Sequence, residues 1–216
     1  MRQLSILSLV LAALIFVSSA AKADISYDYV QLSITPWGEQ DIDGFDDFDY
    51  IGFGLDARVE VAPFVFLLAE ARDNTVDFND NDIALNTFSL GGGGKFGFDV
   101  GPGQIDLLGT LTYERYEALA GSGSGGWGIG GGVRYLIVPQ VELATGLRYV
   151  DYGSIDMLAA TSADIDGIRF NLGGYFHATR SLSFGLEYHL ADLEADVSGS
   201  PDLDEQDIRL IARWNF

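Results

Sequence analysis

The chain has 216 residues, no cysteine and a formal net charge of −20. The acidic excess argues against nucleic acid as a partner, because the phosphate backbone binds basic surfaces. The lack of cysteine excludes disulfides and thiol chemistry, and the length fits a single domain.

The first residues predict export. Arg2 supplies a positive charge, an apolar run follows over residues 4–17, and small residues lead to an A-x-A pattern at residues 21–23. This run is shorter than the roughly 20 residues that a membrane-spanning helix needs. We therefore predict a cleaved signal peptide over residues 1–23 and one domain over residues 24–216.

The rest of the chain alternates apolar and other residues with a period of two. Leu182, Phe184 and Leu186, for example, alternate with Ser183, Gly185 and Glu187. This period predicts β-strands and leaves almost no place for helices. Ten strands are predicted, at residues 25–34, 50–61, 64–72, 84–98, 105–118, 126–137, 141–151, 167–178, 182–192 and 206–216.

The connections between the predicted strands alternate in length. Residues 62–63, 99–104, 138–140 and 179–181 are short connections, whereas residues 35–49, 73–83, 119–125, 152–166 and 193–205 are long ones. All five prolines fall in these connections, where a missing N–H breaks no ladder. Short periplasmic turns and long extracellular loops are typical of outer-membrane barrels.

Closure into a barrel makes such strands compatible with lipid, because every backbone N–H and C=O then pairs with a neighbouring strand. We predict an all-β protein, a transmembrane up-and-down antiparallel β-barrel of about ten strands, with eight strands as the alternative. A soluble calyx is the rival fold, since alternation does not say which face is outside. Aromatic residues near the strand ends favour the membrane barrel. The facing of the strands at 25–34 and 64–72 stays open.

The last strand carries an apolar face that runs to the final residue. Its members are Ile208, Leu210, Trp214 and Phe216. A chain that stops on an aromatic residue in this register resembles the C-terminal sorting signal of outer-membrane barrels. The resemblance implies the barrel-assembly machinery as a partner during biogenesis.

The domain as a whole resembles the small outer-membrane β-barrel families, which include the OmpA transmembrane domain and opacity-type porin-like proteins. The resemblance rests on the opening Ile25-Ser-Tyr27-Asp-Tyr29-Val30, the Gly-rich hairpin strands and the ending Arg213-Trp214-Asn215-Phe216. It implies a location in a Gram-negative-type outer membrane, in contact with lipid and lipopolysaccharide. We expect a monomer. These motifs specify architecture better than activity.

If the apolar face meets lipid, charged residues of both signs point into the barrel. The predicted lumen network consists of Asp56, Arg58, Glu60, Lys95, Asp106, Glu114, Arg134, Glu142, Arg148, Arg169, Glu187, His189, Arg209 and Arg213. These groups must pair, because an uncompensated ion in a low-dielectric interior is costly. Ten strands lie nearer the filled barrels of about eight strands than the open channels of about 16. Inward glycines leave two interpretations open, a thin water-filled path or room for long neighbouring side chains.

The acidic excess is concentrated in the predicted long loops. These residues are Glu39, Asp41, Asp43, Asp46, Asp47, Asp49, Asp73, Asp77, Asp80, Asp82, Asp192, Glu194, Asp196, Asp202, Asp204 and Glu205. Ca²⁺ and Mg²⁺ prefer carboxylate oxygen, so divalent cations that bridge to lipopolysaccharide phosphates are candidate partners. Solvated loops are the simpler interpretation, and no stretch matches a full calcium-binding loop. We assign no metal ligand, cofactor or catalytic residue.

Two functions remain in view. His189 and Glu187 share one face and have the spacing of a base and its orienting group, although membership of the ionic network explains them more simply. We therefore expect no enzyme activity. The favoured role is envelope integrity or surface interaction, and the alternative is a porin-like narrow channel for passive passage of small solutes.

Overall fold

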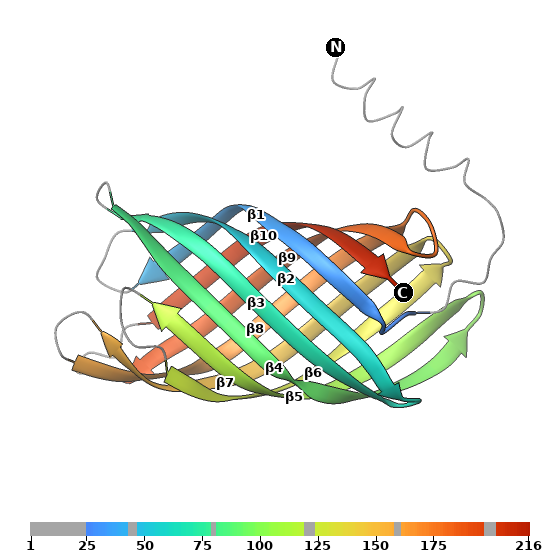
Figure 1. Ribbon diagram of the computed structural model, residues 1–216, viewed down its shortest axis with the longest axis horizontal. Coiled ribbons are helices and arrows are strands. Elements are labelled where there is room, and N and C mark those ends of the chain that lie inside the picture. Colours follow the sequence, from blue (N-terminus) through green and yellow to red (C-terminus); the bar gives the residue numbers. More distant parts are fainter. Residues whose placement is uncertain (1–24, 43–46, 79–80, 119–123, 158–160, 197–201) are drawn as a thin grey trace, which may run out of the picture.

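The computed structural model describes residues 25–42, 47–78, 81–118, 124–157, 161–196 and 202–216 (Figure 1). The predicted signal peptide and the acidic residues Asp43, Asp46 and Asp80 lie outside these ranges. Among the described residues, no helix is long and apolar enough to span a membrane.

Ten antiparallel strands form one closed barrel. They are β1 (Tyr29–Ile42), β2 (Phe48–Ala62), β3 (Val65–Phe78), β4 (Asn81–Val100), β5 (Gly103–Ala118), β6 (Ser124–Val138), β7 (Val141–Met157), β8 (Thr161–His177), β9 (Leu182–Asp196) and β10 (Asp202–Asn215). Each strand pairs with its neighbours in sequence, and β1 pairs with β10 to close the sheet. The predicted all-β up-and-down barrel is confirmed, with ten strands rather than eight.

One end of the barrel, which we call the turn end, holds the short connections at residues 63–64, 101–102, 139–140 and 178–181. Gly101 makes the second of these turns with a φ of 59°, a conformation that glycine adopts without strain. The last residue lies at this end too, since the Phe216 N–H donates to the Asp28 carbonyl at 3.1 Å. The turn end is on the right in Figure 1, and we call the opposite end the far end.

The strands run farther toward the far end than the sequence pattern indicates. Most residues of the predicted long connections belong to strands, so the prediction of long loops is wrong. Pro36 lies inside β1 rather than in a connection, at a register shift between Ile34 and Trp37. A bulge leaves its residue out of the ladder, which removes the cost of the missing N–H. Because a tilted spanning strand needs only about 9–11 residues, strands of 14 to 20 residues extend beyond a bilayer.

The outer face carries a belt of exposed apolar side chains. Leu32 and Phe53 are 60% and 66% exposed, and the rings of Trp127 and Tyr149 pack at a tilt of 53° at the far-end border of the belt. Apolar area exposed all round a closed barrel is the surface of a protein that lies in lipid.

Beyond the belt, toward the far end, the outward-facing positions of the strands are acidic. This acidic outer wall comprises Glu39, Asp41, Asp49, Asp73, Asp151, Asp164, Asp166, Asp192, Glu194 and Asp204. Most of the acidic residues predicted in loops are therefore strand residues.

The interior has three tiers. At the turn end, Ile25, Tyr27, Phe66, Leu68 and Leu136 form a buried apolar cluster. Phe66 and Leu68 settle the open facing of β3, because they point inward while Val65 and Leu67 are exposed. Two further clusters fill the far end, one of Tyr116, Val150, Tyr152, Ile165, Ala191, Leu193, Ala195 and Leu203, the other of Tyr50, Val76 and Leu85. Polar and charged side chains occupy the middle tier.

Candidate functional site: the charged lumen

The structure places every residue of the predicted lumen network on the inward face of its strand. Sequence reasoning missed four further inward charges, Glu70, Arg72, Glu205 and Asp207. Glu70 and Arg72 lie on β3, whose apolar residues occupy both faces and hide the alternation. Asp207 was detectable, because it lies two residues from Arg209 on the same face of β10.

Glu142, on β7, is the centre of the ion pairs near the turn end. It accepts hydrogen bonds from Arg134 Nε at 2.7 Å and Arg134 Nη2 at 3.0 Å. His177 Nε2 and Arg213 Nη1 lie 3.2 and 3.5 Å from its oxygens. The Glu142 side chain is fully buried, so the two arginines and the His177 ring replace the water that would otherwise solvate it.

Other charged groups at the turn end pair with partners on other strands inside the barrel. Lys95 bonds to Glu60, and the Tyr27 hydroxyl donates to Asp106 at 2.8 Å. The Tyr27 ring also lies under the Lys95 ammonium, 4.1 Å from its centroid. Together with the apolar cluster, these contacts pack side chains across the turn end.

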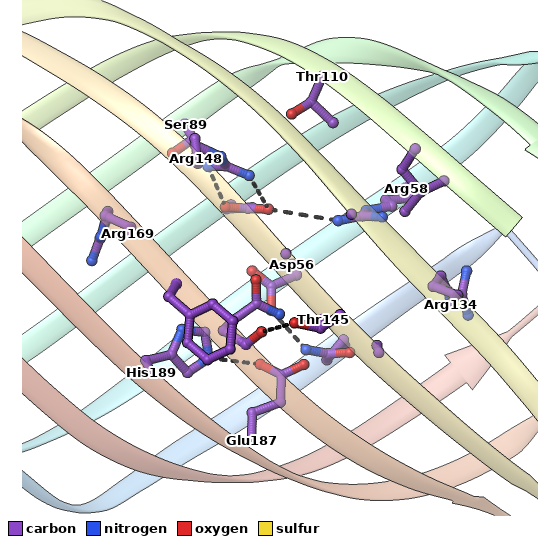
Figure 2. A pocket seen from close by; sticks show the side chains of 18 of the residues that line it. Asp56, Arg58, Ser89, Thr110, Arg134, Thr145, Arg148, Arg169, Glu187 and His189 are labelled. Carbon is purple, nitrogen blue, oxygen red and sulfur yellow. Dashed lines mark hydrogen bonds and ion pairs between the residues drawn. The ribbon is translucent and has the colours of Figure 1, made fainter.

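A cavity of about 160 Å³ occupies the middle tier. At about 30 Å³ per water molecule in the liquid, it has room for about five water molecules. Its walls carry charges of both signs (Figure 2). Arg148 donates to both oxygens of Glu70, at 3.0 and 3.2 Å, and also to Glu114 at 3.2 Å. Ser89 and Thr112 donate to Glu114 as well.

Two more carboxylates line this cavity. Asp56 accepts from Arg72 Nη1 at 2.6 Å and from Gln31 Nε2 at 3.0 Å. Glu187 lies 2.8 Å from His189 Nε2, the contact drawn between these two labelled side chains in Figure 2. The predicted His189–Glu187 contact therefore exists, deep inside the barrel wall.

Tyrosines and ion pairs combine at the border of the cavity and the far-end clusters. Arg209 bonds twice to Asp207, at 2.7 and 2.6 Å, and Tyr50 donates to the same carboxylate at 3.0 Å. Arg169 donates to the Tyr152 hydroxyl at 2.9 Å, and its guanidinium lies 3.6 Å from Glu205. These contacts join β2, β7, β8 and β10 above the cavity.

Ser183, His177 and Glu142 form a chain that resembles a hydrolytic triad. The Ser183 hydroxyl lies 2.7 Å from His177 Nδ1, and His177 Nε2 lies 3.2 Å from Glu142. Ser183 has no exposed surface, and Glu142 is already bound by Arg134. A nucleophile needs access to its substrate, so this arrangement joins β7, β8 and β9 rather than presenting a reactive serine.

The residues of the predicted sorting signal lie on the outer face of β10 and at its end. Leu210, Trp214 and Phe216 are 47%, 58% and 66% exposed, whereas Arg209 and Arg213 between them point inward. Recognition of this face by the assembly machinery stays a prediction.

Comparisons with known proteins find similarity only to solved structures, at low sequence identity. No protein-family model matches it, and no curated protein matches it in sequence. It is similar to the solved structure of Neisserial surface protein A, with 15% identity and a TM-score of 0.43 over 88% of this chain and 98% of that one. An outer-membrane channel from Pseudomonas putida F1 matches at 11% identity and a TM-score of 0.43, over 91% and 99%. The outer-membrane protease OmpT from Escherichia coli matches at 9% identity and 0.43, over 91% and 100%.

Proposed function

We propose that the protein is an exported, non-conducting outer-membrane barrel that acts through its presence and its acidic outer wall, in envelope integrity or surface interaction. The observation that carries this proposal is the filling of the lumen at both ends by buried side chains. Tyr27 and Phe66 stack at the turn end with ring centroids 5.3 Å apart. Tyr116 and Tyr152 pack at the far end with centroids 5.1 Å apart.

The proposed partners follow from the outer face. The exposed apolar belt suits the lipid chains and lipopolysaccharide of an outer membrane, and a monomer leaves this belt free on every strand. The acidic outer wall extends past the belt, where a surface partner reaches it. Within the described part of the chain, no three His, Cys, Asp or Glu side chains are grouped so as to hold a metal ion, so we do not extend the proposal to a divalent cation.

A narrow, gated channel is the second candidate, and the polar cavity in the middle tier favours it. Water and small solutes could pass through the barrel if the side chains of the two end tiers moved aside. Side chains packed at interior density open a path only by rearrangement, so the channel requires a conformational change at both ends. An enzyme is the weakest candidate, because the His189–Glu187 and Ser183–His177 pairs are both enclosed by the barrel wall.

Single-channel recording from refolded protein in planar bilayers tests the proposal. The unchanged protein is expected to show no stable openings. A variant with Tyr27→Ala, Tyr116→Ala and Tyr152→Ala removes rings from both ends and is expected to conduct. The matched control, Tyr113→Ala with Tyr149→Ala, alters only exposed rings of the outer face and is expected to stay silent. Stable openings of uniform size in the unchanged protein would establish the channel instead.

A further inference from the structure

The cavity in the middle tier is lined by more cationic than anionic side chains. Seven arginines face it, Arg58, Arg72, Arg134, Arg148, Arg169, Arg209 and Arg213, against the three carboxylates Asp56, Glu70 and Glu187. Six of these arginines have a carboxylate within 3.6 Å, and for Arg134, Arg169, Arg209 and Arg213 it comes from outside the cavity lining. Arg213 shares its carboxylate, Glu142, with Arg134. The two that are less well matched are Arg58 and Arg213.

Arg58 shares a carboxylate that another arginine already binds. Its nearest anionic atom is Glu70 Oε1, 3.9 Å from Nη2, and both oxygens of Glu70 already accept hydrogen bonds from Arg148. The other contacts of the Arg58 guanidinium are the rings of Tyr29 and Phe66, at 5.9 and 5.4 Å. Rings of this kind attract a cation but accept no strong hydrogen bond.

Arg213 is more deeply buried, with 3% of its surface exposed. Its Nε donates to Gln31 at 2.9 Å. Its Nη1 has no hydrogen-bond partner among the described residues and lies 3.5 Å from Glu142, which Arg134 already binds. A buried donor without an acceptor costs about 1–3 kcal/mol, so this atom is a strong indication of a missing acceptor.

The two arginines lie on either side of one tyrosine. Tyr29 of β1 pairs with Arg58 on β2, and its neighbour Gln31 pairs with Arg213 on β10. The Arg213 guanidinium lies between the rings of Tyr29 and Tyr175, 4.4 and 3.9 Å from their centroids. The two rings hold the Arg213 guanidinium in place among the residues that line the turn-end side of the cavity.

We propose that this floor binds one small oxyanion, of the phosphate, sulfate or carboxylate class, between Arg58 and Arg213. Guanidinium groups match such anions because their N–H donors form a planar fork. A tetrahedral ion of five heavy atoms fits a cavity with room for about five waters. The barrel wall and the end tiers separate this floor from lipid, so the ligand is a free ion rather than a lipid headgroup. The proposal does not depend on the proposed function.

Inorganic phosphate is the probe for the experiment. The predicted mature chain is refolded in detergent at several phosphate concentrations, with sodium chloride added to hold the ionic strength constant. The midpoint of urea unfolding is expected to rise with phosphate and to follow the one-site binding law. Sulfate is expected to act in the same way, whereas chloride is not.

Three variants locate the site. Arg58→Gln and Arg213→Gln are each expected to weaken phosphate binding at least tenfold. Arg115→Gln is the control, because Arg115 is exposed on the outer face and pairs with Glu117, and it is expected to bind phosphate as the unchanged protein does. Phosphate dependence that survives in the Arg58→Gln and Arg213→Gln variants would overturn the assignment.

A direct count keeps the proposal testable if those variants fail to refold. Equilibrium dialysis of the unchanged, refolded protein against radiolabelled phosphate is expected to find one ion per barrel. No saturable binding would overturn the proposal, and so would equal displacement by chloride and by sulfate, because a site selected by guanidinium geometry distinguishes the two.

Discussion

Carboxylates lie on both faces of the barrel wall, but the groups around them differ between the two faces. On the inner wall, Glu142 has two arginines and His177 within 3.5 Å. On the acidic outer wall, carboxylates face one another on neighbouring strands, as Glu39 faces Asp49 and Asp151 faces Asp166. Eight of the ten basic residues after residue 23 point inward. Most basic side chains thus lie inside the barrel, where buried carboxylates need a partner of opposite charge. The carboxylates of the outer wall are solvated by water instead.

This difference has a physical reason. A charge inside the barrel loses its hydration and gains stability only from fixed partners, whereas an exposed charge keeps its hydration and is screened by salt. The inner wall is therefore the part of the molecule in which single substitutions have large effects, and the outer wall is the part that tolerates them.

The largest expected effect comes from Glu142→Gln. The substitution leaves Arg134, Arg213 and His177 around a neutral amide, and removal of one partner of a buried ion pair costs about 3–5 kcal/mol. Urea unfolding of the refolded protein in detergent measures the change. Glu117→Gln is the control, because it breaks the exposed pair with Arg115 and is expected to cost less than about 1 kcal/mol. If both variants lost the same free energy of unfolding, buried and exposed ion pairs would contribute equally, and the difference between the two walls would be refuted.

The sequence predicts those features of the structure that depend on residues close together along the chain. Alternation along single strands is local, and it predicted ten strands and the inward position of Arg134 and Glu142. The far-end boundaries were wrong because the strands continue into acidic segments. Residues 192–195 still alternate as Asp, Leu, Glu and Ala, with Leu193 and Ala195 buried. The alternation continues there because the barrel projects into water with its apolar side chains still directed inward.

The sequence did not predict which lumen residues bond to one another. Tyr50 bonds to Asp207, 157 positions away, and Arg134 donates to the carbonyl of Ser26. Such contacts depend on the radius and the strand stagger of the closed barrel, which alternation does not specify. The end tiers were missed for a related reason. Apolar residues such as Val150 and Leu193 face inward near the far end, whereas alternation alone assigns apolar residues to lipid.

A second comparison of the walls uses glycine. Gly91 points inward, and a Cβ there would lie 2.2 Å from the Leu111 carbonyl oxygen, whereas a Cβ at outward-facing Gly109 meets nothing within 4 Å. Gly91→Ala is expected to cost about 1–3 kcal/mol of unfolding free energy, the range for overpacking. Gly109→Ala, its matched control, is expected to be neutral or slightly stabilising. Urea midpoints of the two variants give the comparison, and a stable Gly91→Ala would show that the inner wall yields to added volume.

The smallest expected effect tests the outer wall itself. Asp49→Asn removes one of two carboxylates that face each other across β1 and β2, and like charges in that position are destabilising. The free energy of unfolding is expected to rise by about 0.2 kcal/mol at low salt. In 1 M salt the gain should vanish, because the screening length falls to about 3 Å. A double-mutant cycle with Glu39→Gln isolates the pair, since the second substitution should add nothing once the first has removed the repulsion. A loss of stability that persists in high salt would instead mean that Asp49 has a specific partner, and the outer wall would then resemble the inner one.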